Sequence, residues 1–170
     1  ASAKAALQLD PKSHEALLVN GELLLAQGRP QLAFDRFDAA LRIWPVSVRA
    51  LIGRAAAEGD LGRLDAMGKT LDAVNAIEEN QPIAGLLRGQ WLAKRDDWKG
   101  ALRIVEILTP KMPHQPALFR LEGEAAFADG EPERAAKGRA RYRGERPNDR
   151  AATLRRAQAQ LAIGDAVSAQ

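Results

Sequence analysis

The chain has 170 residues, of which 46% are hydrophobic and only 5% aromatic, enough to build one ordinary domain around a buried core. It contains no cysteine, which excludes disulfides and any metal site or nucleophile that needs a thiolate. The net charge of +3 is small and no apolar run is long enough to cross a membrane, so neither nucleic-acid binding nor membrane insertion is indicated.

A period of 34 residues runs through the whole sequence. The glycines that carry it are Gly28, Gly62, Gly130 and Gly164. Asp96 fills the vacant position, and Asp tolerates a left-handed turn better than most residues. Prolines keep the same spacing at Pro11, Pro45, Pro113 and Pro147, with Glu79 in the missing position. Small residues also recur at Gly21, Ala55, Gly89, Gly123 and Ala157. A period of 34 is typical of a helix-turn-helix repeat.

Each repeat predicts two antiparallel helices joined at the glycine or Asp96. In chain order we expect helices at 14–27 and 31–43, 48–61 and 65–78, 82–95 and 98–108, and 116–129 and 132–146. The complete repeats are then 12–45, 46–79, 80–113 and 114–147. Residues 1–11 resemble the end of a preceding repeat and residues 148–170 a partial one, so we expect a single array, 1–170, cut from a longer protein.

The segment ALQLDPKSHEALLVNGELLLAQG closely resembles the tetratricopeptide (TPR) repeat. Asn20 and Arg54 depart from it because they stand where the family has leucine, and Arg139 stands where an aromatic is expected. The resemblance implies an all-α, right-handed superhelical solenoid of antiparallel helix pairs that acts as a non-enzymatic protein-interaction scaffold. The same segment is also similar to bacterial TPR lipoproteins of exosortase and exopolysaccharide (PEP-CTERM) systems. That second likeness implies a role in export or protein sorting, in the periplasm or cell envelope rather than the cytoplasm.

The sequence offers no catalytic, cofactor-binding or metal-binding constellation, so we expect no enzyme and no cofactor. His14 and His114 begin first helices too far apart in the array to share a metal. The segment GRLDAMGKT (62–70) lacks the spacing of a phosphate-binding loop. Trp91 is interpreted as a packing residue. Helix glycines such as Gly53 and Gly138 predict softer second and fourth repeats.

The resemblance implies that a partner binds along the concave face, at the second, fifth, sixth, ninth and twelfth places of each first helix. The fifth and ninth places give a candidate partner-binding groove: Leu18, Glu22, Ile52, Leu86, Gln90, Arg120 and Glu124. This set is apolar with few polar groups and lacks a Lys–Asn clamp for a terminal carboxylate. It therefore suits an apolar helix or extended segment of a protein partner. A second interpretation stays open, in which the apolar members only pack between neighbouring first helices.

The stretch 134–156 is strongly basic. Its candidate patch consists of Arg139, Arg141, Arg143, Arg155 and Arg156. Such a face could bind an anionic polymer, either polysaccharide or nucleic acid, or it could be an ordinary solvated helix surface. Because no polar capping helix follows the last repeat, we also expect fraying or end-to-end self-association.

Overall fold

The computed structural model describes residues 13–145, and within this range it holds eight α-helices and no strand. The helices are α2 (His14–Ala26), α3 (Pro30–Ile43), α4 (Val48–Asp60), α5 (Leu64–Ile77), α6 (Pro82–Ala93), α7 (Trp98–Leu108), α8 (Pro116–Ala128) and α9 (Pro132–Gly144). Each lies within two residues of its predicted bounds. The segments 1–11 and 148–170 lie outside the described residues, so the division of the array at its ends stays a prediction.

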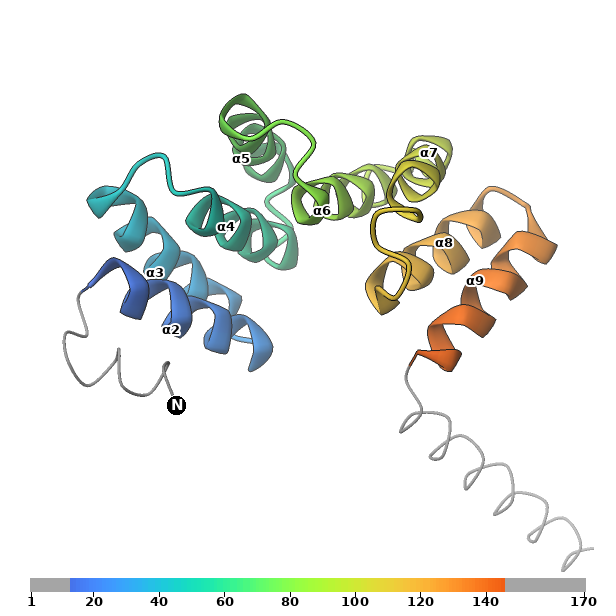
Figure 1. Ribbon diagram of the computed structural model, residues 1–170, viewed down its shortest axis with the longest axis horizontal. Helices are drawn as coiled ribbons and strands as arrows, with labels where there is room; N and C mark the ends of the chain where they lie inside the picture. The colour runs from blue at the N-terminus through green and yellow to red at the C-terminus, as the bar shows by residue number, and fades with distance from the viewer. Residues whose placement is uncertain (1–12, 146–170) are drawn as a thin grey trace, which may run out of the picture.

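The helices form four antiparallel pairs that follow one another along a curved row (Figure 1). The first helices α4, α6 and α8 lie on the inner side of the curve, and α5 and α7 lie on its outer side. The first helices α4, α6 and α8 each pack against their own second helix and against the second helix of the preceding pair, and α2 packs against α3. This stacking buries the apolar face that a single helix pair could not cover alone.

One residue in each turn within a pair has a positive φ: Gly28, Gly62, Asp96 and Gly130. The φ of Asp96 is 62°, close to the 67° of Gly28, which confirms that Asp takes the place of the missing glycine. In both turns a backbone amide just beyond this residue donates to a carbonyl of the first helix: Arg29 N to Leu24 O at 2.9 Å, and Asp97 N to Leu92 O at 3.0 Å. This closure satisfies carbonyls that the helix end would otherwise leave unpaired.

The connection from α5 to α6 differs from the others in a way the repeat pattern does not predict. Glu79 replaces the repeat-ending proline, and the next residue, Asn80, has a φ of 60°. The side chain of Gln81 then accepts a hydrogen bond from Ala84 N at 2.6 Å and caps the start of α6. The chain therefore turns twice in left-handed geometry around α6, at Asn80 before it and at Asp96 after it.

The small residues at mid-helix make room mainly for large side chains rather than for one another. Phe37, fully buried on α3, packs where side chains at Gly21 and Gly53 would have to stand. A Cβ at Gly21 would lie 2.7 Å from the ring of Phe37, and one at Gly53 would overlap that ring. Two small positions also lie close together at Gly123, where an added Cβ would lie 3.1 Å from Arg139 Cγ and 3.5 Å from Ala135 O. Gly53 is thus explained by packing, which helix propensity alone does not show.

The buried side chains form two separate clusters that meet at α6. The first runs through α2–α5 and includes Ala84, and the second begins at Leu86 and continues to Ala135. Polar and aromatic contacts add to the apolar packing between α5 and α6. Trp91 Nε1 donates to Leu64 O at 2.7 Å, while the guanidinium groups of Arg88 and Arg95 lie 5.1 and 5.0 Å from the Trp91 ring. Trp91 is therefore a packing residue, as predicted, and it lies against the first of the two clusters.

We expect Asp96→Gly to raise the free energy of unfolding by up to about 1 kcal/mol, because glycine adopts a positive φ without steric cost. The control is Asp97→Ala at the neighbouring residue. This change removes the carboxylate that accepts a hydrogen bond from Gly100 N at 2.8 Å at the start of α7, so it should lower the free energy of unfolding by about 1 kcal/mol. Urea unfolding followed by circular dichroism measures both. A destabilised Asp96→Gly variant would contradict the assignment of this turn.

Gly89→Leu should lower the free energy of unfolding by about 1–3 kcal/mol through overpacking. A Cβ at Gly89 would already lie 2.8 Å from Leu121 Cδ2 and 3.1 Å from Ile104 Cγ2. The control is Gly144→Ala, where the new Cβ meets no described atom within 4 Å, so stability should be unchanged or slightly raised. Thermal unfolding of both variants is the measurement. An equal loss of stability in the two variants would show that overpacking at Gly89 does not cause the destabilisation.

Candidate binding groove

The first helices α2, α4 and α6 enclose a hollow of about 520 Å³, here named the groove. Its apolar lining comes from all three helices: Leu25, Val48, Ile52, Ala56, Ile83 and Leu87. Its polar rim consists of Glu22 and Arg49 at one side and Glu78 and Gln81 at the other. Ile83 is 37% exposed, so a large apolar side chain faces solvent here. A mostly apolar hollow with a few polar groups at its edge is typical of a binding site.

Arg49 holds the rim of the groove in place through two carboxylates from the neighbouring first helix. It donates to Glu22 through two nitrogens, at 2.7 and 2.8 Å, and to Glu15 at 2.7 Å. The hydrogen bonds to Glu22 are the main cause that raises the pKa of Arg49 above its usual value; those to Glu15 also raise it, and desolvation opposes them. Arg49, Glu15 and Glu22 thus bridge α2 and α4, and together they carry a net negative charge.

A second hollow of about 450 Å³, the polar hollow, lies farther along between α6 and α8. Three of the predicted site residues line it: Gln90, Arg120 and Glu124. Arg120 Nη1 lies 3.4 Å from Glu124 Oε1, so these two side chains pair on one face of α8. Asp60, Lys94 and further residues complete a mixed-charge lining. The predicted site is thus divided between two hollows.

Two of the predicted groove residues are not accessible. Leu18 and Leu86 are 2% and 5% exposed and belong to the two core clusters, so the expectation that they face a partner is corrected. Ile52, at the same place in α4, is only half-buried and lines the groove together with Glu22. The accessible residues missed by the fifth and ninth places are Arg49, Ile83 and Leu87. Arg49 and Ile83 stand at the second place of their first helices and Leu87 at the sixth. The TPR resemblance also implies that these places face a partner.

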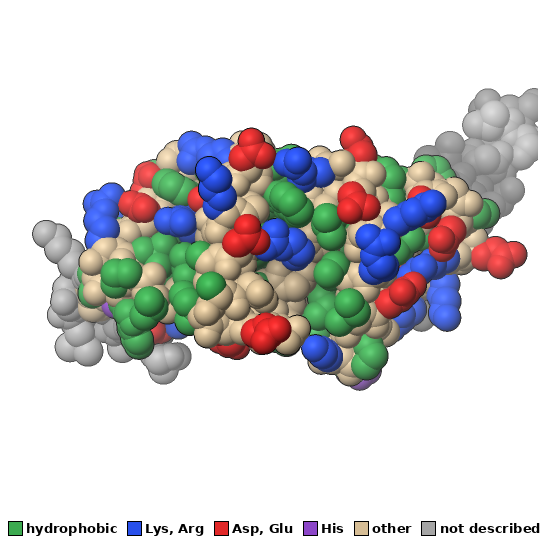
Figure 2. Space-filling model, turned by 90° about the horizontal axis from the view of Figure 1, so that it is seen from above, with side chains coloured by type: hydrophobic (Ala, Val, Ile, Leu, Met, Phe, Trp, Pro, Cys, Tyr) green, Lys and Arg blue, Asp and Glu red, His purple; other side chains and the backbone are tan. Residues whose placement is uncertain are grey.

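The predicted basic patch is partly neutralised on α9. Arg141 lies 3.4 Å from Glu122 and its guanidinium 3.9 Å from the Phe119 ring centroid. The guanidinium of Arg139 lies 4.8 Å from the Phe127 ring, and Arg143 is exposed. Arg155 and Arg156 lie outside the described residues. Seen from the side on which α5 and α7 lie, basic and acidic side chains are interspersed (Figure 2).

Among residues 13–145, no group of three or more His, Cys, Asp or Glu side chains is placed to hold a metal ion. His14 packs near Trp44, with 5.5 Å between ring centroids, and His114 Nδ1 lies 3.1 Å from Glu145 Oε1. The helices of this part of the chain are also too short or too polar to cross a membrane.

No protein-family model and no curated protein matches the sequence. Solved structures do match the fold. The thermophilic TPR protein TTC0263 of Thermus thermophilus is 18% identical, with a TM-score of 0.74 over 94% of this chain and 87% of that one. A TPR protein of Parabacteroides merdae is 20% identical, with a TM-score of 0.70 over 98% and 69% of the two chains. MamA of Desulfovibrio magneticus is 20% identical, with a TM-score of 0.62 over 82% and 78%.

The described part of the chain is a TPR solenoid. This follows from the eight helices of residues 13–145, their 34-residue register and the likeness to solved TPR proteins. The likeness shows the fold, and the partner is a separate question.

We expect Arg49→Gln to lower the free energy of unfolding by less than about 1 kcal/mol, because its ion pairs with Glu15 and Glu22 are half exposed. The loss should shrink when salt is raised from about 0.05 to about 0.5 M. Arg42→Gln, which removes an exposed pair with Asp38 inside α3, is the control and should cost roughly 0.3–0.5 kcal/mol. Urea titrations at both salt concentrations test this, and a loss independent of salt would show that packing rather than charge is the cause.

Proposed function

We propose that this protein is an interaction scaffold that binds an apolar helix or extended segment of another protein in the groove. The observation that carries the proposal is the row of accessible apolar side chains, Ile52, Ile83 and Leu87, contributed by two successive first helices. Burial of such side chains contributes about 25 cal/mol per Å² before the costs of association. A partner segment that lies across α4 and α6 would bury all three.

The charges of the rim favour a partner segment with basic residues beside its apolar face. Glu22 and Glu78 lie on the rim, and Glu15 pairs with Arg49 beside it, so three carboxylates stand against the one guanidinium of Arg49. Glu78 has no ion-pair partner among the described residues. The rim also lacks the paired lysine and asparagine that would bind a terminal carboxylate, so affinity comes from apolar burial, and charge contributes orientation.

We further propose that the protein acts in the bacterial periplasm or cell envelope, in export, exopolysaccharide assembly or protein sorting. The support is the similarity of its first repeat to TPR lipoproteins of exosortase systems, together with the bacterial source of the named structural neighbours. Fractionation of cells that express the full-length protein from its own gene tests the location. Recovery in the cytoplasmic fraction alone would overturn it.

Ile83→Asp should weaken capture of a protein partner by about tenfold or more, because it places a charge on the apolar floor of the groove. Ile43→Asp is the matched control: Ile43 is 55% exposed and lies outside the groove lining. The measurement is quantitative pull-down from extracts of the source organism with tagged protein. Partners retained by Ile83→Asp and lost with Ile43→Asp would contradict the assignment to the groove.

An anionic polymer, polysaccharide or nucleic acid, bound to the basic face at 134–156 is the alternative function. It is supported by Lys137 and Arg143, which are exposed on α9 and have no ion pair among residues 13–145. Arg139→Glu with Arg143→Glu should abolish this binding and leave binding of a protein partner intact. Polyanion binding falls steeply with salt, whereas apolar groove binding does not, so affinity for heparin at two salt concentrations separates the two.

A further inference from the structure

The face of α9 that would meet a further repeat differs from that of the other second helices. At one place of the repeat, α3, α5 and α7 have buried apolar side chains: Phe37, Leu71 and Val105. The residue at the same place on α9 is Arg139, which is exposed and lies over the ring of Phe127. The buried residues of α9 are Ala135 and Gly138, both small. At this place α9 therefore offers no large apolar side chain to a further helix.

The charge of α9 also opposes a basic neighbour. Five Lys and Arg residues stand on this helix against one Glu. Two of the five pair with Glu122 of α8, whereas Lys137, Arg139 and Arg143 have no ion pair among residues 13–145. Segment 150–163, outside the described residues, has three arginines and no acidic residue. The repeat register predicts that this segment begins a fifth repeat, but like charge on the two helices opposes that packing.

Segment 150–163 has the composition that the groove favours. Leu154, Ala157 and Leu161 recur at intervals of three and four residues, which predicts an apolar stripe on one face of a helix. The segment contains no proline or glycine and is rich in Ala, Leu, Gln and Arg, which are strong helix formers. Its positive charges come from Arg150, Arg155 and Arg156. The sequence of the segment therefore predicts an apolar helix that also carries basic residues.

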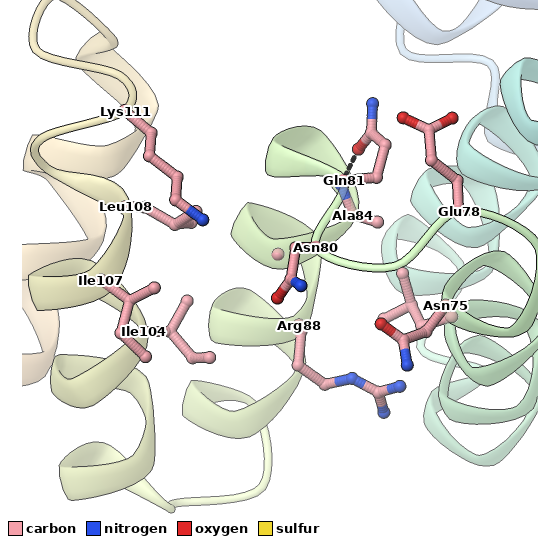
Figure 3. A pocket seen from close by; sticks show the side chains of 12 residues that line it. Asn75, Glu78, Asn80, Gln81, Ala84, Arg88, Ile104, Ile107, Leu108 and Lys111 are labelled. Atoms are coloured by element: carbon pink, nitrogen blue, oxygen red, sulfur yellow. Dashed lines mark hydrogen bonds between the residues drawn. The ribbon is translucent and has the colours of Figure 1, made fainter.

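The groove is complementary to this segment in charge. Glu15 and Glu22 share a single guanidinium, that of Arg49. Glu78 has no ion pair among the described residues, and in Figure 3 its side chain extends away from Arg88. The groove thus joins an apolar lining to an excess of negative charge, and segment 150–163 joins an apolar stripe to an excess of positive charge. Charge complementarity of this kind orients a bound helix and accelerates its association.

We propose that the groove of one copy of this protein binds segment 150–163 of a second copy. The inference rests on the proposed function, because it names a partner for the same groove. Among the described helices α9 packs only against α8, at the opposite end of the row from α2 and α4 (Figure 1). Residues 146–149 span at most about 14 Å, so the segment reaches the groove of a neighbouring copy more readily than its own. Each copy offers one groove and one segment, so the contact repeats head to tail.

The test is self-association of the whole chain, measured as average mass against concentration by analytical ultracentrifugation. We expect the mass of the parent protein to rise beyond that of a dimer, because head-to-tail contacts form open chains. Leu154→Asp with Leu161→Asp removes the segment's apolar stripe, and Ile83→Asp places a charge in the groove. Each variant alone should be monomeric. An equal mixture of the two should form a one-to-one complex and nothing larger, because it contains one intact groove and one intact segment per pair.

A second measurement tests charge without touching the apolar contacts. Glu78→Lys should weaken self-association about fivefold, and Arg155→Glu with Arg156→Glu should do the same. All three changes in one chain should restore much of the loss, because the charges of groove and segment are exchanged together. Glu79→Lys is the matched control, since Glu79 is exposed but does not line the groove, and it should associate as the parent does.

Some outcomes would overturn the inference. They are a parent protein that stays monomeric up to millimolar concentration, a mixture of the two apolar variants that does not form a complex, and undiminished association of the segment variant. The proposed function has a separate readout, the capture of other proteins by the groove. If the parent is monomeric and Ile83→Asp still loses its captured partners, the inference about segment 150–163 fails and the proposed function stands.

Discussion

The structure depends on one left-handed residue in every 34, at the turn between the two helices of a pair. A chain that reverses direction within two or three residues needs a positive φ there, and each of the four described turns has one. The spacing of these residues sets the length of both helices, so the first helices come into register with one another. Once that register is set, each helix packs only against its neighbouring helices. Whether a side chain is buried therefore depends on the side chains of those neighbours.

Packing inside this register works by exchange of large and small side chains between neighbouring helices. Phe37 occupies the space left by Gly21 and Gly53, and Leu108 lies against Gly85, where an added Cβ would stand 3.3 Å from Leu108 Cδ2. A glycine on one helix thus accommodates a large side chain of an adjacent helix. At Gly138, by contrast, two glycines meet, because an added Cβ would lie 2.7 Å from the backbone nitrogen of Gly123.

The repeat period predicts the helices, the turn at Asp96 and the inner face of the solenoid, because these follow from periodicity alone. It does not predict which member of a periodic row is accessible. Leu18, Ile52 and Leu86 share one place in the repeat, yet Ile52 lines the groove while the other two are buried. Differences in the side chains that surround each place cause this. Similarly, Arg54 replaces a family leucine without leaving a buried charge alone, because it bonds to Thr70 and lies 3.5 Å from Glu58.

The departure at Glu79 and Asn80 has consequences on both faces of the solenoid. The loop 78–81 contributes Glu78 and Gln81 to the groove and also to a hollow of about 310 Å³ between α5, α6 and α7. Because Gln81 also caps α6, the loop cannot shift without disturbing the helix that forms the floor of both hollows. The loop 78–81 therefore joins the inner face of α6 to its outer face, and a partner segment in the groove would contact it at Glu78 and Gln81.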